Sequence, residues 1–131
     1  MNLANPQLNL VSAWVGLLLG FVSGMLMGLK FHEENWLGGY TSYPRRMIRL
    51  GHISFFGLAM ANLMFYFVAQ ALPAASISVS VASWLFVVGA VTMPVCCGLM
   101  LLSPRWRHAF VIPVLSLITG ATLTLWEITK L

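Results

Sequence analysis

Residues 50–104 read LGHISFFGLAMANLMFYFVAQALPAASISVSVASWLFVVGAVTMPVCCGLMLLSP, and this stretch decides the fold. Its 55 consecutive residues contain no Lys, Arg, Asp or Glu. One membrane-spanning helix needs about 20 mainly apolar residues, so the stretch is long enough for two crossings. Over all 131 residues, 60% are hydrophobic and 8% are charged, whereas soluble domains carry about a quarter charged residues. The composition therefore predicts a membrane-embedded chain.

Apolar windows of spanning length occur four times, at residues 9–30, 47–70, 78–102 and 109–129. The connections between them are short and leave no room for a soluble domain. Residues 77–88, ISVSVASWLFVV, would be typical of a strand in water. In lipid an isolated strand leaves its backbone groups unpaired, so we expect helix there as well. We predict an all-α fold, a bundle of four transmembrane helices that forms one domain over residues 1–131.

The basic residues are distributed unevenly between the two sides of this predicted bundle. One of the seven, Lys130, lies on one side, and the connection around Pro73 to Ser76 is uncharged. The other six surround the first and third connections: Lys30, Arg45, Arg46, Arg49, Arg105 and Arg107. The positive-inside rule then predicts a multi-pass protein of the bacterial inner membrane with both termini outside the cytoplasm.

The five arginines are expected to contact lipid headgroups. The alternatives are an acidic partner surface or the carboxylates of a cofactor. The net charge of +4 is explained by this topology and does not indicate a nucleic-acid partner. Serine followed by proline, at Ser42-Tyr43-Pro44 and Ser103-Pro104, predicts the starts of the second and fourth helices.

Glycine recurs at every fourth position through the first window, at Gly16, Gly20, Gly24 and Gly28. In a helix these residues share one face and let another backbone approach closely. We expect the partner to be a stripe of small residues in the second window: Gly51, Ser54, Gly57 and Ala61. The alternative is a helix of another protein. Asn62, in the middle of the second window, is expected to hydrogen-bond between helices.

His52 is the strongest candidate for binding a cofactor, because an ionisable group inside a membrane helix is a functional-site hypothesis by default. Neutral imidazole can ligate haem iron or a chlorophyll-type pigment, or hydrogen-bond a quinone. The alternative is that His52 lies at headgroup depth and bonds a neighbouring group. By depth, His52, Thr92 and Cys96 could line one pocket with the Gly24 surface. Cys96 and its neighbour Cys97 are more often small apolar packing residues.

Two segments carry a resemblance to a known family. Residues 37–65, LGGYTSYPRRMIRLGHISFFGLAMANLMF, and residues 104–126, PRWRHAFVIPVLSLITGATLTLW, resemble a family of small, uncharacterised four-helix bacterial membrane proteins. The resemblance covers most of the chain. It implies a four-helix membrane fold and no established activity, so no functional residue is carried over from it.

Three functions are compatible with these observations. The first is a small non-catalytic membrane subunit that packs against, or helps assemble, a larger energy-converting complex, respiratory or photosynthetic. The second is a protein that binds haem, a pigment or a quinone through His52. The third is a small transporter or channel, although the first window has no carboxylate before Glu33 to couple export to protons. Whichever function holds, we expect the protein's partners to be membrane lipids and other integral membrane subunits. We do not expect the protein to be an enzyme.

Overall fold

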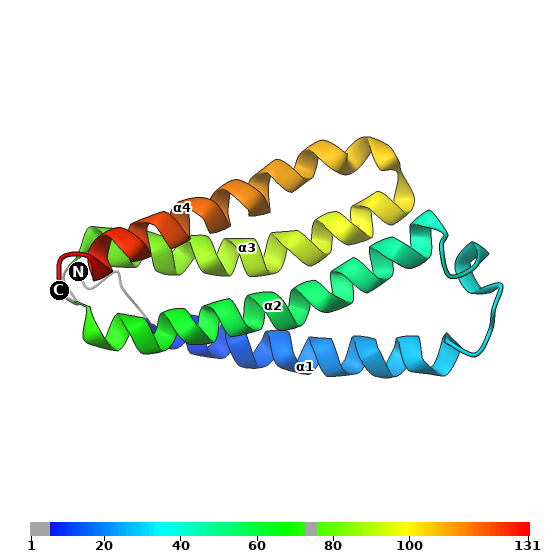
Figure 1. Cartoon of the computed structure of the whole chain (residues 1–131), viewed down its shortest axis with the longest axis horizontal. Coiled ribbons are helices and arrows are strands. Elements are labelled where there is room, and N and C mark those ends of the chain that lie inside the picture. Colours follow the sequence, from blue (N-terminus) through cyan, green and yellow to red (C-terminus); the bar gives the residue numbers. More distant parts are fainter. Residues whose placement is uncertain (1–5, 73–75) are drawn as a thin grey trace.

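The computed structural model describes residues 6–72 and 76–131, and it is all-α in those ranges (Figure 1). The helices are α1 (Pro6–Lys30), α2 (Tyr43–Ala71), α3 (Ile77–Leu102) and α4 (Val111–Ile128), with short 3-10 helices η1 (Trp36–Gly38) and η2 (Pro104–Phe110). With η2 joined to α4, all four are long and apolar enough to cross a membrane. The predicted all-α class and the four helices are confirmed. Most of the uncharged connection near Pro73 lies outside the described residues.

The helix starts follow the serine and proline signals. The Ser42 hydroxyl accepts a hydrogen bond from the backbone N–H of Arg45 at 3.4 Å, with a proline in the first turn of α2. At η2 the Ser103 hydroxyl accepts from the N–H of Arg105 at 3.3 Å. Such caps satisfy donors that a helix start leaves open. Residues 77–88 are helical, as the argument from lipid required.

The helices pack in chain order, α1 against α2, α2 against α3 and α3 against α4, with a smaller contact between α1 and α3. The outer helices are therefore α1 and α4. Figure 1 shows the α1–α2 and α3–α4 connections together at one end, and the start of α1 and the end of α4 at the other. We call the first the arginine end, because it holds Arg45, Arg46, Arg49, Arg105 and Arg107, and the second the terminus end.

The apolar core lies between the inner helices, towards the terminus end. Its buried members come from the second half of α2, from Leu72 directly after it and from the first half of α3, and Leu117 and Leu123 of α4 pack against them. Among these residues, the rings of Phe65 and Phe86 lie 5.1 Å apart. Such a pair contributes beyond the area it buries.

Three polar side chains are buried beside this core and join three helices. Asn9 of α1 donates from Nδ2 to Oδ1 of Asn62 at 2.8 Å and to the carbonyl of Ser83 at 3.1 Å. The Ser83 hydroxyl donates to Oδ1 of Asn9. Asn62 in turn donates to the carbonyls of Leu58 and Phe86. Asn62 thus bonds between helices as predicted, and Asn9 was not foreseen.

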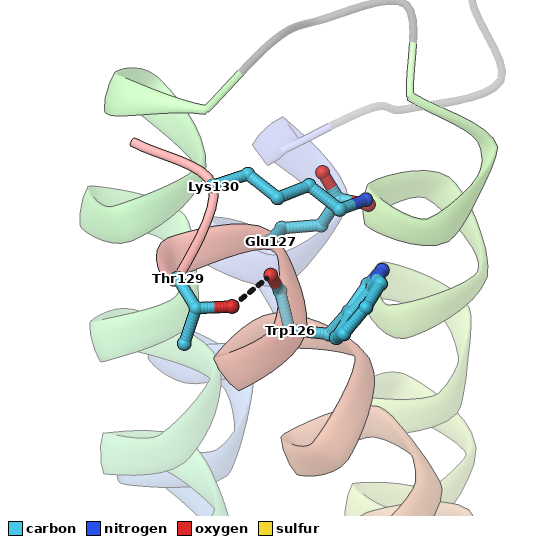
Figure 2. A network of polar contacts seen from close by, with 4 residues as sticks. All are labelled: Trp126, Glu127, Thr129 and Lys130. Carbon is cyan, nitrogen blue, oxygen red and sulfur yellow. Dashed lines mark hydrogen bonds and ion pairs between the residues drawn. The ribbon is translucent and has the colours of Figure 1, made fainter.

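The end of α4 is fixed by a second set of polar contacts, shown in Figure 2. Glu127 is only 4% exposed and pairs with Nζ of Lys130 at 2.9 Å. Lys130 also lies over the Trp126 ring, 5.1 Å from its centroid. The Thr129 hydroxyl donates to the Trp126 carbonyl at 2.8 Å. The buried carboxylate at the terminus end is therefore charge-paired.

Candidate ligand-binding cleft

His52 lies on the face of α2 that packs against α1, and two α1 residues fix its ring. Nδ1 of His52 is 2.9 Å from the Ser23 hydroxyl. A Cβ added at Gly24 would lie 2.9 Å from Cε1 of the ring, so the absence of a side chain there makes room for the imidazole. The edge of the ring also meets Phe56, with centroids 5.4 Å apart and planes at 86°. The ring is held on three sides.

The Ser23 hydroxyl has one hydrogen and two neighbours that can accept it. Its oxygen lies 3.0 Å from the carbonyl oxygen of Gly20 and 2.9 Å from Nδ1 of His52. Where the hydrogen goes to the Gly20 carbonyl, the hydroxyl oxygen accepts from Nδ1, and Nε2 is then the acceptor of the ring. Among the described residues Nε2 has no hydrogen-bond partner, yet it is not sealed from solvent.

A cleft of about 310 Å³ adjoins the His52 ring. We call it the His52 cleft. It lies between α1, α2 and α3, beside η1, and its wall is almost entirely apolar. Besides His52 and Ser23, the lining residues are Leu26, Met27, Trp36, Met47, Ile48, Gly51, Phe55, Pro94, Cys97, Gly98 and Leu101. One oriented polar atom in an apolar cleft is the usual composition of a small-molecule site.

A second cleft, of about 360 Å³, continues along the same groove towards the terminus end. Phe55 and Pro94 line both clefts, so the two meet at these residues. The second is lined by α1 and α3 side chains such as Val15, Leu19 and Val95, with Gly16 among them. We call it the Gly16 cleft. Together they form one apolar groove between the outer helix α1 and the inner helix α3.

Three of the four predicted packing glycines of α1 face α2. An added Cβ would lie 3.0 Å from Cβ of Ala59 at Gly16 and 2.8 Å from the Phe56 ring at Gly20. At Gly24 it would meet His52, as described above. At Gly28 no atom lies within 4 Å among the described residues. The glycines thus meet a histidine, a phenylalanine and an alanine.

The small residues expected on α2 lie elsewhere. Gly51 faces α3, where an added Cβ would be 3.4 Å from Cβ of Cys97. Gly57 is exposed, and no described atom lies within 4 Å of the position of its missing side chain. Ala61 packs against the core, and the Ser54 hydroxyl donates to the Gly51 carbonyl at 2.7 Å. This stripe does not face the glycines of α1.

The arginine end holds one buried guanidinium. Arg45 is 3% exposed and donates to the carbonyls of Glu34 and Phe31 at 3.3 and 3.5 Å. It stacks on three aromatic rings of the α1–α2 connection, 5.2–5.6 Å from their centroids: Phe31, Trp36 and Tyr40. Arg45 therefore organises that connection.

The other arginines are more accessible. Arg49 is half-buried and stacks on Tyr40 at 4.2 Å, while Arg46, Arg105 and Arg107 are exposed. Close by, Nζ of Lys30 donates to the Glu33 carboxylate at 2.8 Å, and this bond holds the pKa of Glu33 below its usual value. A lipid or partner surface remains available at three of the five arginines.

The cleft differs in part from the pocket predicted from the depths of His52, Thr92 and Cys96. His52 and Cys97 line the same cleft, and Gly24 touches His52. Cys96 is buried and is not among the lining residues, and neither is Thr92, whose hydroxyl donates to the Val88 carbonyl at 2.7 Å. Pro94, Trp36 and Phe55 line the cleft, and sequence reasoning had given them no role there. Their apolar character carries no signal that separates a cleft wall from lipid-facing surface.

Comparisons with protein-family models, with curated proteins and with solved structures gave no match to the chain.

Proposed function

We propose that the chain crosses the bacterial inner membrane four times, with the arginine end in the cytoplasm and both termini outside. Four apolar helices of spanning length support this. So do large apolar side chains that are more than half exposed on the outer helices, such as Trp14, Phe21 and Ile118. Six of the seven basic residues lie at the arginine end. In water such a surface would cause aggregation, and in a bilayer it is the expected surface.

In that membrane the chain acts as a non-catalytic subunit that docks against a larger complex. One observation carries this proposal: Gly57 is exposed on α2, and nothing described fills the space beside it. A glycine in a helix costs about 1 kcal/mol relative to alanine. Close approach of another helix is the usual compensation in membranes. Because no described part of the chain fills this space, we infer that a helix from outside approaches Gly57.

The host complex that we propose is an energy-converting one, respiratory or photosynthetic. Such complexes work with small apolar cofactors, and the apolar cleft beside His52 is compatible with a ligand of that general kind. Among the described residues the buried charged side chains are Arg45 and Glu127, which lie at opposite ends of the bundle. Ion-coupled transport usually depends on a charged group at mid-depth. This distribution favours docking over transport.

The experiment is native electrophoresis of gently solubilised membranes, with a tag placed after Leu131. We expect the protein to migrate in a species much larger than itself, and co-purifying subunits to be identifiable by mass spectrometry. Migration only as a monomer or a small homo-oligomer would contradict the proposal.

A substitution at Gly57 tests the docking face. Gly57→Leu places an isobutyl group where the partner helix should approach, so the large species should be lost while the isolated protein stays folded. Ala121→Leu adds comparable bulk at an exposed position of α4 and serves as the matched control. Equal migration of both variants with the unmodified protein would remove Gly57 from the interface.

A further inference from the structure

We propose that the His52 cleft binds an amphiphile whose head is an aromatic ring with a hydroxyl group, a phenol or a quinol, and whose apolar chain lies in the Gly16 cleft. The ligand's hydroxyl donates a hydrogen bond to Nε2 of His52. This inference goes beyond docking of a subunit. It depends on the groove and on one imidazole, and it needs no partner protein.

The polar part of the site is the His52 ring. In this proposal the Ser23 hydrogen goes to the Gly20 carbonyl, 3.0 Å away, and the hydroxyl oxygen accepts from Nδ1. That assignment leaves Nε2 as an acceptor. A ligand that only accepts hydrogen bonds, such as a quinone carbonyl or an ether, finds no donor there, whereas a hydroxyl does. The site therefore distinguishes a reduced quinol or a phenol from its oxidised or methylated counterpart.

The wall of the cleft suits an aromatic head group. Trp36 of η1 and Phe55 of α2 line it, together with Met27 and Met47. Aromatic rings and thioethers make favourable contacts with an aromatic ligand. The volume of about 310 Å³ is at the small end of ligand pockets, which suits a single ring.

The position of the chain follows from the shared residues. Phe55 and Pro94 border both clefts, so a tail leaving the ring passes between them into the Gly16 cleft. From the level of Ser23 to that of Ser12, α1 rises by roughly 16 Å at 1.5 Å per residue. The groove is open along its side, so a ligand dissolved in the bilayer reaches it laterally.

The experiment compares matched probes on the purified full chain in nanodiscs by isothermal titration calorimetry. The probes are a long-chain para-alkylphenol, its methyl ether, and an aliphatic alcohol of equal length. The phenol should bind about 3–10 times more tightly than the ether, the effect of one net hydrogen bond. The phenol should also bind more tightly than the alcohol, because of the aromatic wall. Equal or reversed binding of phenol and ether would overturn the proposal.

Two variants and one control locate the hydrogen bond. His52→Phe keeps a ring but removes the acceptor, so phenol and ether should bind equally. Ser23→Ala removes the partner of Nδ1, so either ring nitrogen can carry the hydrogen. The ratio of phenol affinity to ether affinity should then fall. His108→Phe changes an exposed histidine of η2 and should leave the preference unchanged. Thermal unfolding shows whether each variant is folded, and loss of preference in the control would contradict the assignment.

A visible absorption spectrum separates this ligand from a metal macrocycle. A band retained on gentle isolation and lost in His52→Ala would mean that Nε2 is bound to a metal centre, which would overturn the phenol assignment. The two proposals fail separately. If electrophoresis shows no large complex but the protein still prefers the phenol, the subunit proposal is wrong and the ligand proposal holds.

Discussion

The polar cluster near the terminus end and His52, nearer the arginine end, differ in how fully their polar atoms are bonded. Near the terminus end, Asn9, Asn62 and Ser83 bond one another across three helices, and Glu127 pairs with Lys130. Nearer the arginine end, His52 has one nitrogen bonded and the other open to a cleft. A satisfied polar cluster fixes how helices pack, whereas an unsatisfied atom is available to a ligand. The polar cluster therefore fixes the packing near the terminus end, and His52 is the place where we propose that a ligand binds.

The same contrast holds for apolar packing. The buried cluster around Phe65 and Phe86 lies between α2 and α3 towards the terminus end. The groove between α1 and α3 runs from the middle of the bundle towards the arginine end. Because α1 is an outer helix, opening the groove costs few contacts of the core. A ligand can enter there without unfolding the part that holds the bundle together.

The largest expected effect concerns which end faces the cytoplasm. We expect alkaline phosphatase fused after Leu131 to be active outside the cytoplasm, since six of the seven basic residues lie at the opposite end. Replacing Arg105 and Arg107 by glutamine weakens the charge bias between the two ends. A larger share of the molecules should then insert with the terminus end in the cytoplasm. Full phosphatase inactivity with a well-expressed fusion would invert the assignment of the two ends.

The next effect concerns the contact between α1 and α2. Gly16→Leu should lower the free energy of unfolding in detergent by about 1–3 kcal/mol, because the new side chain meets Cβ of Ala59 and the Phe55 carbonyl, which cannot swing away. Gly20→Leu should cost less, since its obstacle is the mobile end of the Phe56 ring. Gly57→Leu is the control and should be close to neutral. Equal stability of the Gly16 and Gly57 variants would refute the close approach.

These glycines also show how far the sequence could predict the packing. Fourfold spacing identifies the face of α1, because helix periodicity fixes it. It does not identify what that face meets, since the rotation of α2 depends on packing against α1 and α3 together. The gap left by a missing side chain accepts a ring as readily as another small residue. His52 and Phe56 therefore occupy places where small residues of α2 were expected.

The polar cluster shows a second limit. Asn62 lies deep in an apolar window, so its need for a partner could be read from the sequence. Asn9 lies at the edge of the first window, where an asparagine is equally typical of an interfacial residue. Only the meeting of α1 with α3 shows that it is fully buried. Likewise, His52 could be identified from the sequence, but the cleft beside it depends on the positions of three helices and could not be.

A smaller effect concerns the cluster at the terminus end. Asn9→Leu should reduce stability by about 1 kcal/mol, because Asn62 and Ser83 each lose a buried partner. Because the two side chains are in direct contact, Asn62→Leu should lower the free energy of unfolding less in the Asn9→Leu protein than in the unmodified protein. A double-mutant cycle in detergent measures this coupling. Strictly additive losses would mean that the two asparagines act independently.

The smallest expected effect concerns the α1–α2 connection at the arginine end. Leu37 has φ 54° and ψ 30°, the left-handed region that leucine adopts at a cost. Its carbonyl accepts a hydrogen bond from the Ser42 hydroxyl at 2.6 Å, so the turn is coupled to the cap of α2. Leu37→Asn should raise stability by about 0.5 kcal/mol, since asparagine tolerates this conformation without glycine's extra freedom in the unfolded chain. Leu37→Ala is the matched control, because it shortens the side chain but keeps the strained Cβ, and it should bring no gain. Chemical unfolding of both variants in detergent decides the point, and a gain for alanine equal to that for asparagine would locate the cost in the exposed leucine side chain rather than in the backbone.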